Sequence, residues 1–94
     1  MRIDRRGREE VFWDLTDAPA GAVEVTFDGQ TWTAMDRTGD TVSVLVAGPD
    51  ATDPAAVVLD EGRHFALLRA TAAPEVLVRS AGVIDIVTLQ PAPV

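Results

Sequence analysis

The sequence predicts one all-β domain, an antiparallel sandwich or barrel of the immunoglobulin-like or a related kind, with about eight strands. Turn signals recur about every eight to twelve residues, and runs rich in β-branched residues lie between them. A chain of 94 residues holds one core and is too short for two. No stretch keeps a helical period over ten residues or more, and Pro54 interrupts the best candidate, 51–57.

The first predicted strand is Glu9–Leu15, and a turn at Thr16–Gly21 follows it. The strand alternates, with Val11, Trp13 and Leu15 on one face and Phe12 between two acidic residues on the other. We therefore expect the first face to be buried and the second to be exposed.

The clearest unit is a hairpin over 22–35, where Asp28-Gly29 is a two-residue type I′ turn signal. Closing the hairpin at this pair sets Val25 opposite Trp32, with both side chains on the buried face. The threonines at 31 and 33 then lie on the wet face. A shift of one residue would invert the faces.

The remaining strands follow in order, separated by Gly-, Asp- and Pro-rich turns. Thr41–Ala47 is apolar on both faces, which is typical of a central strand. Ala55–Leu59 and His64–Ala70 are expected to form a second hairpin. Glu75–Ser80 is followed by a turn at Ala81-Gly82 and by a last strand, Val83–Leu89.

The charges divide the chain into a basic start and an acidic body. Residues 1–8 hold four arginines against Asp4, a balance of +3, and residues 9–94 hold four arginines against fourteen acids, a balance of −10, which together give the net −7. An acidic body repels nucleic-acid phosphates, so DNA contact is expected only through the start of the chain. No lysine is present.

The predicted domain organisation is a basic N-terminal arm (residues 1–8), a β-sandwich (9–90) and an extended tail (91–94), since Pro91 and Pro93 end the sheet. No strand pattern begins before Glu9, so we expect the arm to be mobile. It is either a solvated tail or a docking element for carboxylates of a neighbouring subunit. Its expected partner-binding residues are Arg2, Arg5, Arg6 and Arg8, with the exposed Phe12 beside them.

No residue pattern states a reaction, so we expect no enzyme, no cofactor and no metal site. The chain has no cysteine and one histidine, His64, which excludes thiol chemistry and a two-histidine metal site within the chain. A turn or surface role is the ordinary one for this histidine. Paired aspartates in three loops could supply calcium ligands, but they match no EF-hand spacing, and aspartate is a common turn residue.

Two further features bear on location. The sequence has no uncharged run approaching the ~20 residues of a membrane span, so no membrane is expected. The first ten residues lack the apolar stretch of a signal peptide, so secretion by that route is not expected.

The order of segments resembles a family of small all-β head and head–tail structural proteins of tailed phages of high-GC actinobacteria. The segments that carry the resemblance are IDRRGREE, VTFDGQTW, LVAGPDA and APEVLVRSAGVIDI. It implies a virion structural protein, assembled in the host cytoplasm in many symmetric copies. Portal, adaptor, capsid or tail subunits would be its partners. The alternatives are a capsid decoration protein and a small ligand- or carbohydrate-binding β module.

Overall fold

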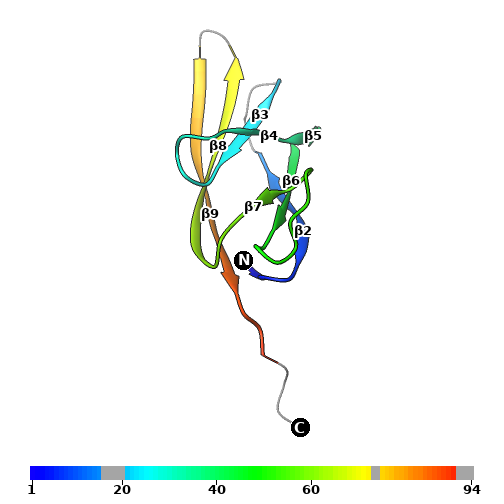
Figure 1. Cartoon of the computed structure of the whole chain (residues 1–94). Coiled ribbons are helices and arrows are strands. Elements are labelled where there is room, and N and C mark those ends of the chain that lie inside the picture. Colours follow the sequence, from blue (N-terminus) through cyan, green and yellow to red (C-terminus); the bar gives the residue numbers. More distant parts are fainter. Residues whose placement is uncertain (16–20, 73–74, 91–94) are drawn as a thin grey trace.

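A computed structural model describes residues 1–15, 21–72 and 75–90. All regular structure in these residues is β, in nine strands, which confirms the all-β prediction and adds one strand to the expected count. The strands form two sheets (Figure 1). Their bounds are β1 Arg2–Asp4, β2 Arg8–Asp14, β3 Val23–Thr26, β4 Thr33–Ala34, β5 Asp36–Thr38, β6 Thr41–Ala47, β7 Val57–Val58, β8 Gly62–Ala72 and β9 Glu75–Val87.

The larger sheet has the order β1-β9-β8-β3-β4 and is dominated by the long β8–β9 hairpin. The hairpin extends past the end of the other sheet in Figure 1. Its strands pair from Gly62↔Ile86 to Ala72↔Glu75, with a bulge where β9 has two residues, Ala81 and Gly82, against one on β8. The expected turn at Ala81-Gly82 is therefore wrong. Gly82, at φ +90°, supplies the backbone shape of a bulge inside one continuous strand.

The smaller sheet centres on β6, which pairs with β2 along one edge and with β5 and β7 along the other. The prediction of a central strand at Thr41–Ala47 is confirmed. The prediction that Ala55–Leu59 and His64–Ala70 form a hairpin is wrong. β7 pairs in parallel with β6, and β8 pairs with β3 and β9. Sequence periodicity cannot reveal a parallel partner that lies in another part of the chain.

The core lies between the two sheets and is built from β-branched residues. Val11 and Leu15 are buried as predicted, Trp13 packs partly buried against them, and Phe12 is 64% exposed. The most deeply buried apolar side chains come from both sheets and include Ile3, Val23, Val25, Val42, Val46, Ile84 and Ile86.

The predicted register of the first hairpin is wrong by one residue. The structure pairs Val25 with Thr33, not with Trp32, and the connection is longer than two residues. The carboxylate of Asp28 accepts the N–H groups of Gln30 and Thr31 at 2.7 Å, and the Thr26 hydroxyl accepts that of Gly29 at 3.0 Å. These side-chain acceptors hold a wider loop open in place of a type I′ turn.

The shift of register exchanges the inward and outward side chains of the segment around β4, so Trp32 is not a core residue. Its ring lies under the guanidinium of Arg69, whose central carbon is 4.1 Å from the ring centroid. Arg69 also forms an ion pair with Glu24, directly opposite it on β3. This cluster lies on the outer face of the larger sheet, and Thr33 faces inward in place of the tryptophan.

The first eight residues are part of the fold, so the expectation of a mobile arm is wrong. β1 pairs in parallel with Asp85–Val87, and Ile3 is 1% exposed in the core. Asp4 accepts the Gly7 N–H at 2.8 Å, which closes a turn into β2. The predicted tail, residues 91–94, lies outside the described residues.

Candidate functional site

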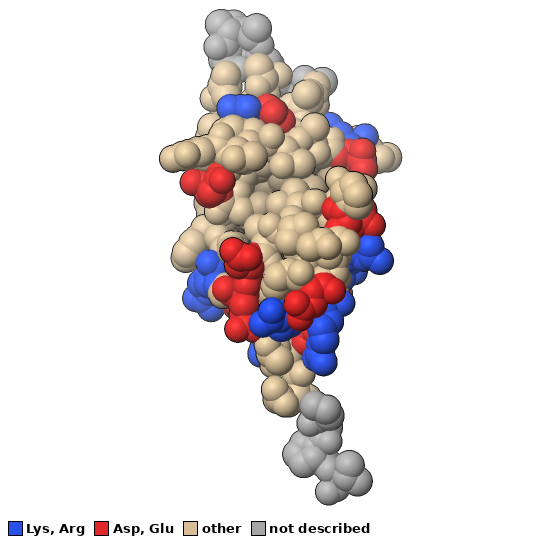
Figure 2. Space-filling view, viewed as in Figure 1, with Lys and Arg blue, Asp and Glu red and all other residues tan. Residues whose placement is uncertain are grey.

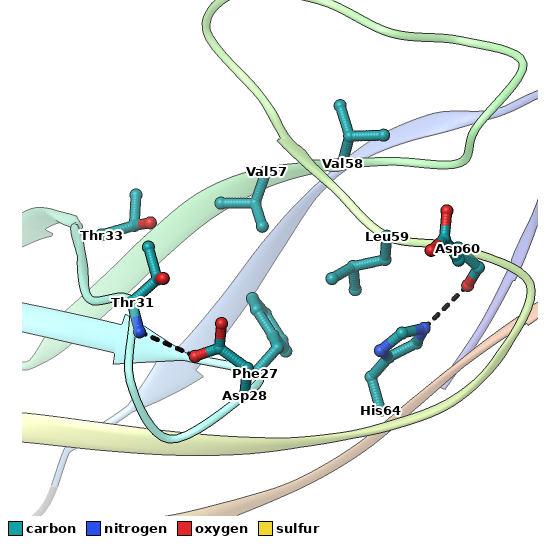
Figure 3. Close-up of a pocket in the computed structure, with 9 residues that line it drawn as sticks. All are labelled: Phe27, Asp28, Thr31, Thr33, Val57, Val58, Leu59, Asp60 and His64. Carbon is teal, nitrogen blue, oxygen red and sulfur yellow. Dashed lines mark hydrogen bonds between the residues drawn. The ribbon is translucent and has the colours of Figure 1, made fainter.

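One groove opens between the two sheets on the side of β4 and β7 (Figure 3). Its volume is about 300 Å³. Phe27, Val57 and Leu59 form its apolar part, and Figure 3 shows these three side chains pointing toward one another. Hydroxyls, carboxylates and the single histidine stand around them at Asp28, Thr31, Thr33, Asp60 and His64.

Two polar side chains of this groove, Asp28 and His64, already have structural partners. One carboxylate oxygen of Asp28 accepts two backbone N–H groups and the Thr26 hydroxyl, and these donors lower the pKa of Asp28 to about 2. Nε2 of His64 lies 2.7 Å from the Asp60 carbonyl oxygen. No pair of groups in the groove is placed as a nucleophile and its base. The hydrogen bonds of Asp28 and His64 in this groove thus serve the local structure of the two loops that line it.

The N-terminal arginines bind carboxylates of this same chain. Arg5 reaches Asp50 at 2.8 Å, and Arg8 reaches Asp53 at 2.6 Å. The loop that carries both aspartates packs on the N-terminal turn, where Gly48 donates its N–H to the Gly7 carbonyl. The guanidinium groups of Arg5 and Arg8 are therefore already paired with carboxylates of this chain, and docking on a neighbouring subunit stays a prediction.

The other two arginines flank Asp4 and Asp85. Arg6 binds the Asp4 carboxylate at 2.7 Å, and the N–H of Leu89 donates to the same carboxylate. These donors, Arg6 first, hold the pKa of Asp4 well below its usual value. Arg2 is exposed in β1, and its charge adds to that of Arg63 in lowering the pKa of Asp85. Half of the basic charge thus lies at one end of the sandwich, among acidic groups.

A second groove lies on the other side of the two-sheet structure, between β2 and β9, and has a volume of about 330 Å³. Phe12, Met1 and Val83 line it, with Trp13 behind them. The Trp13 indole N–H donates to the Ala81 carbonyl at 2.9 Å and ties the two sheets together there. Phe12 is thus exposed at the mouth of an apolar groove, where a partner can bury it.

The sequence reasoning missed an exposed apolar stripe on the outer face of the larger sheet. Phe65 is 66% exposed, Val76 54% and Val78 53%. The signal was present in the alternation of Glu75–Ser80, whose valines occupy every second position. Nothing in that alternation shows which face the domain leaves uncovered.

Residues 1–15, 21–72 and 75–90 contain no group of three histidine or acidic side chains placed to hold a metal ion. The same residues contain no helix of the length and apolarity needed to cross a membrane.

Comparisons with known proteins return no match. No family model, no curated protein and no solved structure matches this chain.

Proposed function

We propose that the chain is a non-enzymatic structural protein of a tailed-phage virion, a head–tail connector or another head-associated component. The order of its sequence segments supports the phage origin. Its body, in this proposal, is an immunoglobulin-like or related β-sandwich. Portal, adaptor, capsid or tail subunits are its partners. The chain assembles with them in the host cytoplasm, in many symmetric copies, and resides in the virion.

The observation that carries the binding role is Phe12 at the mouth of the β2–β9 groove. A large aromatic side chain that is 64% exposed beside an apolar hollow is a typical anchor of a protein interface. The backbone is also open there. Leu15 donates its N–H to Asp40, so alternation along β2 leaves the amide of Phe12 on the edge that no described strand covers.

The N-terminal arginines should contribute less to partner binding than their charge alone suggests. Arg5, Arg6 and Arg8 each hold a carboxylate of this chain, so a partner or DNA phosphate would have to displace an existing ion pair. We therefore assign the main contact to apolar burial at Phe12 and propose no DNA role for the described arginines.

The test is incorporation into particles. Gradient-purified particles from a host lysate are analysed by mass spectrometry for this chain, with wild type compared with Phe12→Asp. The matched control is Phe65→Asp, which places the same change at an equally exposed phenylalanine on another face. We expect wild type and the control in particles and Phe12→Asp absent from them. Particles without the wild-type chain, or with all three proteins in equal amount, would contradict the proposal.

A second candidate function is a small ligand- or carbohydrate-binding module. The groove of Figure 3 favours it, because Phe27 lies beside hydroxyls and carboxylates that could bind a polyol. A panel of neutral sugars should then raise the melting temperature of wild type but not of Phe27→Ala. The third alternative, a capsid decoration protein, shares the Phe12 contact and differs only in where the chain lies on the particle.

A further inference from the structure

No strand in the described part of the chain pairs with the edge of β9 near the hairpin tip. β1 covers only Asp85–Val87 of this edge, and no other described strand pairs there. Met35 donates its N–H to the Val23 carbonyl, so the backbone groups of Val23 face β4 and those of the next residue, Glu24, face β8. Following this alternation through the paired residues of β3, β8 and β9 shows which backbone groups of β9 face away from β8. The alternation of antiparallel strands then directs the N–H and C=O groups of Val76, Val78 and Ser80 toward the open edge.

At the positions whose backbone groups face this edge, β9 lacks the charged side chains that proteins usually place on an open strand. Its exposed cation in this stretch, Arg79, has its backbone groups directed toward β8. β2 also has an open edge, but Glu10 and Asp14 flank Phe12 on it, and charged side chains discourage strand pairing. Along β9 the outward positions are two half-exposed valines and a serine. Unpaired amides beside β-branched side chains are the complement of another extended strand.

We propose that this edge pairs with the same edge of a second copy, antiparallel and about a two-fold axis at Leu77. In this register Val76 lies opposite Val78 of the other copy, and Leu77 lies opposite Leu77. All three central pairs are apolar and self-complementary, as a two-fold interface requires. The register shifted by one residue about Val78 would instead set Leu77 against Arg79, which is unfavourable.

Charge also favours a second copy at this place. The β8–β9 hairpin, residues 62–87, holds three arginines, one glutamate and one aspartate, a balance of +1. The other residues have a balance of −8, and the two sum to the net −7. In Figure 2 most charged side chains of the visible face gather in the lower half, away from the hairpin tip. Tip-to-tip pairing keeps the remaining parts of the two copies, which are net acidic, apart and so limits the like-charge repulsion between them.

The inference rests on the β9 edge and not on Phe12, so it is tested on the purified chain. Light scattering after size-exclusion chromatography measures the mass at concentrations up to about 1 mM, because so short an edge implies a weak dimer. We expect the mass to rise toward twice the 10.0 kDa of one chain. Val78→Lys should stay at the monomer mass, and Val58→Lys, the same change at an exposed valine elsewhere, should behave as wild type.

Single cysteines test the register, because the chain has no cysteine of its own. A non-hydrogen-bonded antiparallel pair at the axis brings two Cα atoms to about 4.5 Å, within disulfide range. Leu77→Cys should therefore cross-link to itself under mild oxidation. Ser80→Cys should not, since its two copies would lie roughly 20 Å apart.

Three results would overturn the inference. They are a monomer at every concentration, a Val78→Lys variant that still dimerises, and a cross-link at position 80 in preference to 77. If Leu77→Cys fails to fold, as seen by circular dichroism, the light-scattering comparison of the two lysine variants decides alone. Loss of Phe12→Asp from particles bears on the proposed function and leaves this result unaffected.

Discussion

Asp28 shows how one carboxylate decides a local structure. Its Oδ1 accepts backbone N–H groups from two residues that follow it, and the hydroxyl of Thr26 donates to the same oxygen. Aspartate holds loops open in this way because its short side chain reaches the amides of the next residues. The Asp-Gly pair is therefore not a sufficient signal for a two-residue turn.

The Asp28 carboxylate should stabilise the protein in a pH-dependent way. Its pKa is lowered from 3.8 to about 2, so its contribution is complete above the unfolded pKa and is lost as the pH falls through the folded pKa. We expect Asp28→Ala to melt at a lower temperature than wild type at pH 7, with the gap closing between pH 4 and pH 2. Asp28→Asn, which keeps an acceptor without a charge, should melt closer to wild type at pH 7. A gap independent of pH would contradict this role.

Trp32 should contribute little to stability for a tryptophan. It stacks on Arg69 at the outer face, and an exposed cation–π contact is worth about 0.5–1 kcal/mol. We expect Trp32→Ala to lower the free energy of unfolding by about 1 kcal/mol, and Ile84→Ala, in the core, by about 2–5 kcal/mol. Urea unfolding of the two variants measures this. An equal loss of unfolding free energy in the two variants would contradict this placement and indicate that Trp32 is a core residue.

At the scale of elements, the N-terminal strand is the main departure from expectation. β1 has three residues and one apolar side chain, so it shows no alternation by which a strand could be predicted. Its parallel partner lies over 80 residues away in the sequence. The turn after it is closed by the Gly7 N–H and the Asp4 carbonyl, and it has residue types common in β-turns, aspartate first and glycine last. Short parallel edge strands depend on tertiary contacts that a local pattern does not contain.

Removing the buried side chain of β1 should destabilise the whole domain. Ile3 is 1% exposed, so Ile3→Ala should lower the free energy of unfolding by about 2–5 kcal/mol. Arg2→Ala, at the exposed neighbouring position, should change it by no more than about 0.5 kcal/mol. Denaturant unfolding of both variants decides. An Ile3→Ala variant with an unchanged free energy of unfolding would contradict the burial of β1 and support a mobile N-terminal arm.

Gly48 should tolerate a side chain less well than Gly29. A Cβ at Gly48 would overlap the backbone of Arg5, where the loop packs on the N-terminal turn. Gly29 has φ +80° with open space around it, so alanine there meets only backbone strain of about 1–2 kcal/mol. We expect Gly48→Ala to unfold at a lower urea concentration than Gly29→Ala. The opposite order would show that the loop and the turn do not pack closely.

The sequence predicted what depends on alternation and missed what depends on pairing. The inward face of Val11 and Leu15 and the exposure of Phe12 follow from the side-chain period. The bounds of the strand at Thr41–Ala47 follow from its continuous apolar run between turn residues. The register of β3 with β4, the parallel strands and the partners of the arginines depend on distant segments. For the candidate site, Phe12 was predictable, and the groove beside it was not.

At the scale of the whole molecule, the charge pattern and the apolar surfaces have separate roles. The basic N-terminal residues and the acidic loop neutralise each other at one end of the sandwich. The exposed apolar side chains lie elsewhere, at Phe12 and along the β8–β9 hairpin. Contacts with neighbours should therefore depend on burial of apolar surface and only weakly on ion pairs.

The central claim, that this chain binds its neighbours in the particle by apolar contact, is tested by washing purified particles across a salt series. Exposed ion pairs are screened over about 8–10 Å at moderate ionic strength and over about 3 Å at 1 M salt, whereas apolar burial is not weakened. We measure the fraction of the chain that stays with the particles from about 0.05 to 1 M sodium chloride. We expect the whole of the chain to stay with the particles at every salt concentration. Progressive release as the salt concentration rises would contradict it and assign the contact to the arginines.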